Sequence, residues 1–496
     1  MSIQGAWQQV LGFLGAMPIV VEPIQAEMSS DAGLLPIRQL DEAWGLTEQW
    51  AAALVDHRAG PALTHTYREM TRSRVYGILA GYEDQNDHDT LRRDPVFKLI
   101  ADRLPTDRDL ASQPTLSRFE NAIGPASLWN LRDVLVDQFI ASFAAPPTHL
   151  TFDIDVIDDP THGQQQLTFF HGYYDQYQYL QRVITCAEND QLVMAQLLFG
   201  TAAASLGADE DLEYLVGRLR RAWPEVRISL RADAGFALPD FYLACEALDV
   251  RYSIGLGMNA VLKRESEALL AEALRQFETS GQPQRLFDGF WYQAQTWPTP
   301  RWVVLKAEAQ AAGTNRRAVV TNRPGACVLP QAAYDEYTER GESENRNKEL
   351  KCSLRGDRLS DHRFLANYFR LYLHCAAANL LVRLRRIVAN PPPPQRTSEE
   401  SEALLTGQPV PAPLPASQLA GRERKRYFNH RRQQDPLGEG HAETWRTRLI
   451  KVAAEIVVSS RRVVVRLSSS WPHLAHYRTV CEAVLRVSPL AAGDSS

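Results

Sequence analysis

Four residues of the segment YTERGESENRNKELK have side chains that can act on phosphate esters and metal ions. Written as a spacing, they are Tyr337-x2-Arg340-x3-Glu344-x6-Lys351. Because an α-helix advances by about 100° per residue, all four would fall within an arc of roughly 60°. The sequence therefore predicts one helix face that carries a carboxylate, two cations and a phenol.

Two other segments place aspartates on expected strands. TFDIDVIDD contains Asp153 and Asp155, whose two-residue spacing puts both on the same side of a sheet. LRADAGF contains Asp233 at the end of a later strand. Ligand sites of α/β sheets are commonly built at strand ends, so these aspartates are candidates for one shared site. Each alone would be interpreted as a turn or capping residue.

The combination of strand-end aspartates with Glu344 is typical of a site for a hard divalent cation, Mg²⁺ or Mn²⁺. Two such ions can stabilise the attacking and leaving oxygens of an in-line phosphoryl transfer. Arg340 and Lys351 would hold backbone phosphates near the metals. The residues alone leave open whether Asp153 or Asp155 is the first ligand.

The elements that would position these residues indicate a mixed α/β fold. Residues 36–145 have the apolar spacing of helices. Three β-rich segments follow, which we predict to be consecutive strands: 149–157, 165–174 and 178–186. The next segments are predicted to be helices at 191–206 and 210–223, a strand at 226–233, a helix at 239–248 and a strand at 250–257. Such alternation predicts a central sheet covered by helices.

Residues 258–328 interrupt this alternation with a helix at 260–278 and three antiparallel strands, which predicts a β-rich insertion. A long apolar helix at 362–386 follows the signature segment. We predict these domains: a helical DNA-binding region at 1–145, the core at 146–257 and 329–390, the insertion at 258–328, a disordered linker at 391–421, and a basic C-terminal α/β region at 422–496. That last region contains the basic run 422–432, a helix at 444–462 and a strand at 463–469.

Composition and charge exclude some functional classes. The 496 residues carry a net charge of −5, which argues against a uniformly basic protein but permits a local basic groove. The six cysteines contain no C-x-x-C pair, so neither a zinc module nor a disulfide framework is indicated. With no apolar run of membrane-spanning length and no basic leader, the sequence predicts a cytoplasmic protein.

These motifs together resemble the bacterial insertion-sequence transposases of the DDE class, specifically the subgroup DDE transposase group 1. The resemblance rests on DIDVIDDPTHGQQ, FFHGYYDQYQYL, LRADAGF, RRAVVTN and the signature segment. It implies a ribonuclease-H-like catalytic core in which Asp155, Asp233 and Glu344 bind two Mg²⁺ ions, with Mn²⁺ as a substitute. Those ions would activate water and then a DNA 3′-hydroxyl for strand cleavage and transfer.

The resemblance also implies partners and contacts. Tyr337, Arg340 and Lys351 would contact phosphates of double-stranded DNA near the scissile bond, at transposon ends and in target DNA. A homodimer would hold the two ends in a synaptic complex in the bacterial nucleoid. Two positions depart from the family pattern, since Ile157 replaces a usual threonine and Ala234 a usual serine. A lost hydroxyl there would weaken hydrogen bonds to the carboxylates.

Alternatives remain for other residues and for the whole chain. His162 and His171 are possible metal ligands, although ordinary turn and strand histidines fit better. Trp291 and Trp297 are possible base-stacking residues, with packing inside the insertion as the favoured alternative. A host nuclease built on the same core, or a catalytically inactive domesticated DNA-binding protein, would have a similar sequence.

Overall fold

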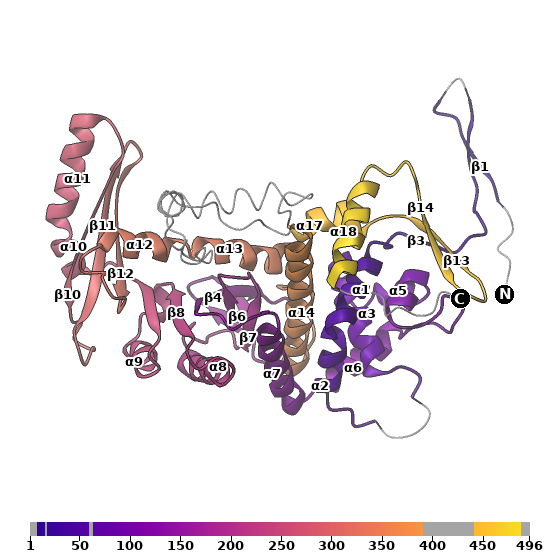
Figure 1. Cartoon of the computed structure of the whole chain (residues 1–496), viewed down its shortest axis with the longest axis horizontal. Helices are drawn as coiled ribbons and strands as arrows, with labels where there is room; N and C mark the ends of the chain where they lie inside the picture. The colour runs from indigo at the N-terminus through magenta and orange to yellow at the C-terminus, as the bar shows by residue number, and fades with distance from the viewer. Residues whose placement is uncertain (1–6, 15–16, 59–62, 390–440, 488–496) are drawn as a thin grey trace, which may run out of the picture.

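The computed structural model describes residues 7–14, 17–58, 63–389 and 441–487. It is a mixed α/β protein built around one nine-stranded sheet. Helices cover both faces of that sheet, and further helices from the N-terminal part of the chain lie at one side of it (Figure 1). The predicted linker at 391–421 and the basic run 422–432 lie outside the described residues.

Five strands form the centre of the sheet, in the spatial order β7-β6-β4-β8-β9. Their bounds are β4 (His149–Pro160), β6 (Gln176–Cys186), β7 (Leu192–Leu198), β8 (Arg227–Ala232) and β9 (Arg251–Leu256). β4, β6 and β7 pair antiparallel, whereas β4–β8 and β8–β9 pair parallel. A short strand, β5 (Phe169–His171), pairs with the beginning of β6. It is shorter than the predicted strand at 165–174.

The predicted helix at 191–206 is wrong, because Leu192–Leu198 is strand β7. This segment is buried along nearly its whole length, between β6 and the helix α14. A short apolar run that is buried on all sides has no periodicity that separates strand from helix. Pairing with β6 therefore decides its structure.

The insertion extends the central sheet instead of forming a sheet of its own. Its helices are α10 (Ala260–Glu265) and α11 (Glu267–Ser280), and its strands are β10 (Gln284–Tyr292), β11 (Arg301–Gln310) and β12 (Gly313–Thr321). The predicted antiparallel pairing of these strands is confirmed. Because β12 also pairs with β9, hydrogen bonding is continuous from the insertion to the core.

Helices cover both faces of the sheet and sequester two large cores. One face packs α8 (Ala208–Ala222) and α9 (Pro239–Ala247) over β4, β8 and β9. The other packs the 26-residue helix α14 (Phe364–Ala389). The N-terminal helices are α1 (Leu34–Trp44), α2 (Leu46–Ala53), α3 (Tyr67–Ala80), α4 (His88–Leu91), α5 (Pro95–Ile100), α6 (Gln113–Asn121) and α7 (Pro125–Ala141). α14 also contacts five of them, namely α1, α2, α3, α6 and α7.

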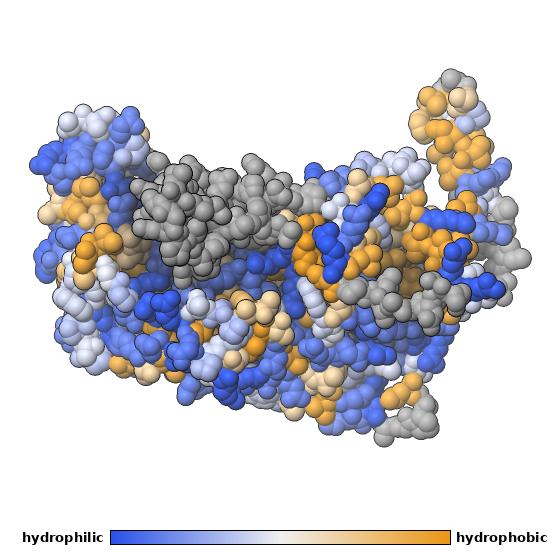
Figure 2. All heavy atoms as spheres, viewed as in Figure 1, coloured by the Kyte–Doolittle hydropathy of each residue, from blue (hydrophilic) through white to orange (hydrophobic). Residues whose placement is uncertain are grey.

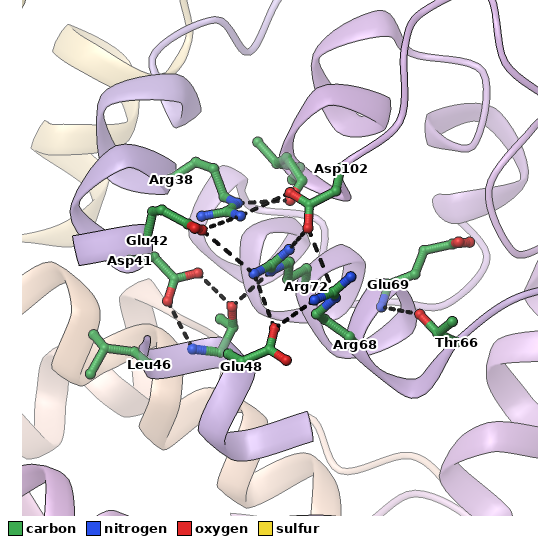
Figure 3. A network of polar contacts seen from close by, with 12 residues as sticks. Arg38, Asp41, Glu42, Leu46, Glu48, Thr66, Arg68, Glu69, Arg72 and Asp102 are labelled. Atoms are coloured by element: carbon green, nitrogen blue, oxygen red, sulfur yellow. Dashed lines mark hydrogen bonds and ion pairs between the residues drawn. The ribbon is translucent and has the colours of Figure 1, made fainter. Parts of the chain in front are cut away.

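Arginines of the N-terminal helices mostly hold those helices together (Figure 3). The Arg72 side chain is 3% exposed and pairs with Asp102, Glu42 and Glu48. Arg68, one helical turn before Arg72, pairs with Glu48 and Asp102. The Arg72 guanidinium, buried among its carboxylate partners, is structural in this conformation and unavailable to DNA phosphates.

The described C-terminal residues pack against the N-terminal helices and pair with β3. The predicted helix at 444–462 is wrong: α17 (Ala442–Trp445) and a π-helical turn (Arg446–Ile450) give way to β13 (Ala454–Val458), which pairs with β14 (Val463–Leu467). The β-branched run of β13 favours a strand, and pairing with β3 (Met28–Ser29) fixes it there. The last helix, α18 (Leu474–Val487), packs on α1 and α14.

A hairpin of β1 (Gln9–Leu11) and β2 (Ile19–Val21) projects from the end of the molecule that also carries β13 and β14 (Figure 1). Its surface is mostly hydrophobic (Figure 2). No helix within the described residues is long and apolar enough to cross a membrane.

Candidate active site

The signature segment is not the single continuous helix that its spacing predicts. It comprises α12 (Pro330–Thr338), α13 (Gly341–Lys348) and a π-helical turn, η2 (Glu349–Ser353). At the junction, Arg340 N–H donates to the Tyr337 carbonyl at 3.1 Å and Ser343 N–H to the Arg340 carbonyl at 2.9 Å. These tighter turns surround Gly341, a residue that weakens a helix interior. The signature residues are therefore divided among three helical segments, and their side chains do not follow the single arc predicted for one helix.

Arg340 nevertheless joins two of the candidate carboxylates. Its Nη1 lies 2.9 Å from Asp155 Oδ2 and its Nη2 lies 2.8 Å from Glu344 Oε1. The Asn347 side-chain amide donates to the same Asp155 oxygen at 3.2 Å. Asp155 on β4 and Glu344 on α13 therefore meet around one guanidinium group. Asn347 was missed from the sequence, although it lies one helical turn after Glu344.

The electrostatic environment of Asp155 is unusual for an aspartate. Its side chain is 15% exposed, whereas that of Glu344 is 60% exposed. Burial raises the pKa of Asp155 to about 6, the Arg340 charge opposes this shift, and the negative charges of Asp233 and Glu344 add to it. Three carboxylates therefore influence one another across this part of the sheet.

Asp233 follows β8 directly, at the start of a short 3-10 turn (Ala234–Phe236). Its Oδ1 accepts a hydrogen bond from Gly235 N–H at 2.9 Å, which fixes the carboxylate at the strand end. The Tyr337 hydroxyl lies close to β9: a Cβ added at Gly255 would be 2.7 Å from it. The negative charge of Asp233 contributes to the raised pKa of Tyr337, after burial as the main cause. Tyr337 thus lies between Asp233 and Arg340.

Lys351, the last signature residue, contacts a fourth acidic side chain. Its Nζ lies 2.5 Å from Asp158 Oδ1, and the Gln176 amide donates to Asp158 Oδ2 at 3.1 Å. Burial opposes ionisation of Asp158, but the hydrogen bonds from Lys351 and Gln176 lower its pKa overall. Asp158 was not singled out from the sequence.

Asp153 has a different environment from Asp155. It is 3% exposed and accepts two hydrogen bonds from Arg231, at 2.6 and 2.8 Å. Arg231 also contacts Glu339 and donates to the Glu336 carbonyl, so this pair ties β4 and β8 to the end of α12. The Asp153 carboxylate is therefore fully occupied by its internal ion pair with Arg231.

The remaining sequence candidates are dispersed. Trp297 is buried against Tyr242 and Tyr292, as its packing alternative predicts, whereas Trp291 is exposed on β10. His171 contacts Tyr174 edge-on, at 5.0 Å between ring centroids. Ile157 is buried in the core and Ala234 is exposed beside Asp233. His162 is exposed in the loop after β4.

The donor set fits a divalent cation by its chemistry. Asp155, Asp233 and Glu344 offer only hard oxygen ligands, and their mutual repulsion is the kind that a cation relieves. Within the described residues, no three Asp, Glu, His or Cys side chains converge closely enough to form a ready-made metal site. The positive charge between Asp155 and Glu344 is the Arg340 guanidinium. For one ion to be shared by these carboxylates, Arg340 must turn away.

Comparison with known proteins identifies the class. Residues 14–398 match the family described as Transposase DDE domain group 1, so the chain belongs to this family of DDE transposases. It is therefore a protein of DNA transposition, from a class that generally uses divalent metal ions. No curated protein matches the chain.

One solved structure that the chain resembles is described as a cryo-EM structure of the piggyBac transposase synaptic complex with hairpin DNA. The two share 13% identity, and the alignment covers 95% of this chain and 90% of that one with a TM-score of 0.36. A TM-score this low does not establish a shared fold.

Proposed function

We propose that this transposase cuts and joins DNA by metal-dependent phosphoryl transfer at Asp155, Asp233 and Glu344. The observation that carries the proposal is the meeting of Asp155 and Glu344 around Arg340, with Asp233 at the end of the neighbouring strand. When bound, two Mg²⁺ ions would supply Lewis-acid activation of the attacking oxygen and charge stabilisation of the leaving oxygen. Mn²⁺ would be a substitute, since both ions take carboxylate oxygens.

The order of the strands supports a ribonuclease-H-like core. Three antiparallel strands in chain order, β4, β6 and β7, are followed by β8 and β9, which add parallel to β4 on its other side. In this arrangement Asp155 lies on the central strand and Asp233 at the end of its parallel neighbour. The insertion, residues 258–328, would shape the site from the β9 side and hold the transposon end.

The basic side chains of the site would bind the DNA backbone. On metal binding, Arg340 would leave the carboxylates and become free to hold a phosphate, an interaction for which a guanidinium is well suited. Lys351 and the Tyr337 hydroxyl would contact neighbouring phosphates. Asn347, which donates to Asp155, would keep that carboxylate oriented.

Asp155 is the better first ligand than Asp153. Asp153 already has a buried arginine as a bidentate partner, and removal of that contact would leave Arg231 without its main counterion. Asp155 faces the other carboxylates and is partly accessible to solvent. A metal ion would replace Arg340 as its counter-charge with little rearrangement of the core.

We also propose that residues 1–145 recognise terminal inverted repeats of double-stranded DNA, and that 422–496 adds contacts. Exposed arginines such as Arg93, at 71%, are the available cations of the helical region, since Arg72 and Arg74 are buried in ion pairs. Two transposon ends require two active sites in one complex, most simply a homodimer.

The experiment is strand cleavage of a labelled duplex that carries the terminal repeat of the element, in Mg²⁺, Mn²⁺ or EDTA. We expect metal-dependent nicking at the repeat boundary by the wild type, and a loss of at least a hundredfold in Asp155→Asn and Glu344→Gln. Strand transfer to a target plasmid separates a transposase from a host nuclease. Binding of the repeat without any cleavage would instead indicate a non-catalytic DNA-binding protein.

A further inference from the structure

The hairpin formed by β5 and the start of β6 exposes several large aromatic side chains. Its residues 169–177 are called the aromatic hairpin here. The exposed fractions of its large side chains range from 43% to 85%: Phe169 43%, Phe170 48%, Tyr173 85% and Tyr177 58%. Single exposed apolar residues are normal, but four exposed rings in nine residues, of which Phe170 and Tyr177 lie 5.6 Å apart between ring centroids, need an explanation.

The base of this hairpin is firmly fixed. Gln166 N–H donates to the His362 carbonyl at 2.9 Å, and the Tyr179 hydroxyl donates to the Gln166 carbonyl at 2.5 Å. Gly200 lies so close to the hairpin that an added Cβ would meet Phe169 N at 2.5 Å. The rings therefore project from a rigid support, which reduces the entropy lost when a ligand is bound.

The hairpin also adjoins the candidate active site. Asp158 on β4 receives Lys351 on one oxygen and Gln176 of the hairpin on the other. Tyr174, at the hairpin turn, lies 5.0 Å from Tyr173 between ring centroids. After burial, the charges of Asp158, Asp233 and Asp155 contribute to the raised pKa of Tyr174, so its ring lies within electrostatic reach of the site.

A cation beside exposed aromatic faces is the combination that binds single-stranded nucleic acid. The cation holds a backbone phosphate, and the rings stack on bases regardless of sequence. A protein partner would also bury aromatic rings, but it would not explain why the aromatic hairpin adjoins Lys351 and the carboxylates. A fully paired duplex offers no free base faces except at its ends.

We propose that the aromatic hairpin is a stacking site for unpaired deoxynucleotides of the DNA strand next to the scissile phosphate, with Tyr173 as its outermost ring. This inference rests on the proposed function, because it places the unpaired bases beside the phosphate that Lys351 would hold. It places base stacking in the core, whereas the sequence suggests such stacking only for Trp291 and Trp297 of the insertion, with packing as the favoured alternative.

The test compares a fully paired duplex with a forked duplex that carries 2-aminopurine in its unpaired arm. Measurements are made in EDTA, so that no cleavage occurs. We expect the wild type to bind the fork more tightly and to quench the 2-aminopurine. Tyr173→Leu and Phe170→Leu should each weaken fork binding about tenfold and relieve quenching, with duplex affinity unchanged. Tyr173→Phe should behave as the wild type, because it keeps the ring.

Leu243→Ala is the control, since Leu243 is a 42% exposed apolar side chain on α9, outside both the aromatic hairpin and the insertion, and its loss should change neither fork nor duplex binding. Equal fork affinity in the leucine variants and the wild type would overturn the inference. So would an equal loss of fork and duplex binding, which would indicate a general contact with DNA. The cleavage assay is run on the same proteins: a wild type that cuts but shows no fork preference overturns only the stacking site. Failure to cut with intact, ring-dependent fork binding overturns only the catalytic proposal.

Discussion

Two aspartates separated by one residue on β4 have opposite structural roles. Asp153 and Asp155 each pair with an arginine, but Arg231 comes from the adjacent strand and Arg340 from the break between two helices. The first pair is enclosed in the core, and the second lies at a partly exposed junction. The local sequence does not identify either arginine partner, because Arg231 and Arg340 are 78 and 185 residues away from their aspartates.

Substitution of each aspartate by asparagine separates structure from chemistry. Asp153→Asn should lower the free energy of unfolding by about 3 kcal/mol, because it leaves buried Arg231 without its bidentate partner. Asp155→Asn should change it by less than about 1 kcal/mol, since burial already disfavours its charge. Denaturant unfolding measures both. A destabilised Asp155→Asn beside a stable Asp153→Asn would reverse the two assignments.

Asp159 provides a prediction on pH. It is fully buried, and burial raises its pKa well above the ordinary value. The folded state thus keeps a proton that the unfolded state releases above about pH 4, so this residue makes stability fall as pH rises from there. Asp159→Asn should remove that contribution, by about 1.4 kcal/mol per pH unit within the window.

Unfolding of Asp159→Asn and wild type from pH 4 to 7 tests this prediction. The difference in free energy of unfolding should increase in favour of the variant as pH rises. A difference that is independent of pH would show that Asp159 is ionised in the folded protein.

At the scale of elements, the sequence predicts the strands with alternating or β-branched patterns and fails where two structures share one pattern. β4, β8, β9 and the three insertion strands are found where predicted. Leu192–Leu198 is a strand because β6 has a free edge there, and no local signal conveys that. The signature spacing correctly grouped Arg340 with Glu344, yet it could not show that the helix breaks at Arg340 and so lets that residue reach Asp155.

The position of the aromatic hairpin depends on one glycine of the following segment. Gly200→Ala would place a methyl group against the Gln178 carbonyl and within 2.6 Å of the Phe169 carbonyl oxygen. Because these are backbone atoms, β5 must shift. We expect a loss of about 1–3 kcal/mol in stability, together with faster hydrogen exchange at Phe169–His171.

The control for that variant lies in the same hairpin. Gly172→Ala adds a methyl group that meets nothing within 4 Å, so stability and exchange should change little. Melting curves and amide exchange by mass spectrometry measure both variants. If Gly200→Ala exchanges as slowly as wild type at β5, the glycine does not position the hairpin.

At the scale of the whole molecule, the described C-terminal residues complete the N-terminal core. Trp445, Leu449 and Val480 belong to the same hydrophobic cluster as residues of α1 and α3. Glu349 of the π-helical turn accepts hydrogen bonds from Arg385 on α14 and from Ala442 N–H, which links the signature segment to this tail. The sequence predicts a C-terminal region at 422–496 but does not predict that part of it shares a core with the N-terminal helices.

Trp445→Ala tests the shared core. The side chain is fully buried, so its removal should lower the free energy of unfolding by about 3–5 kcal/mol. Protection of amides in α1 and α3 should fall together with that of β13. Trp291→Ala, at an exposed position, should change stability by less than about 1 kcal/mol. Loss of protection confined to residues 441–487 would show instead that the tail folds by itself.

The pairing of β3 with β13 has a consequence for synthesis of the chain. A ribosome releases residues 28–141 long before residues 441–487 exist, so the N-terminal helices emerge with an apolar surface that lacks its cover. That surface stays exposed while several hundred further residues are synthesised, in contact with chaperones or with other nascent chains. A premature stop codon ahead of residue 441 would remove Trp445, Leu449 and Val480 and so disable the N-terminal layer, far from the position of the lesion.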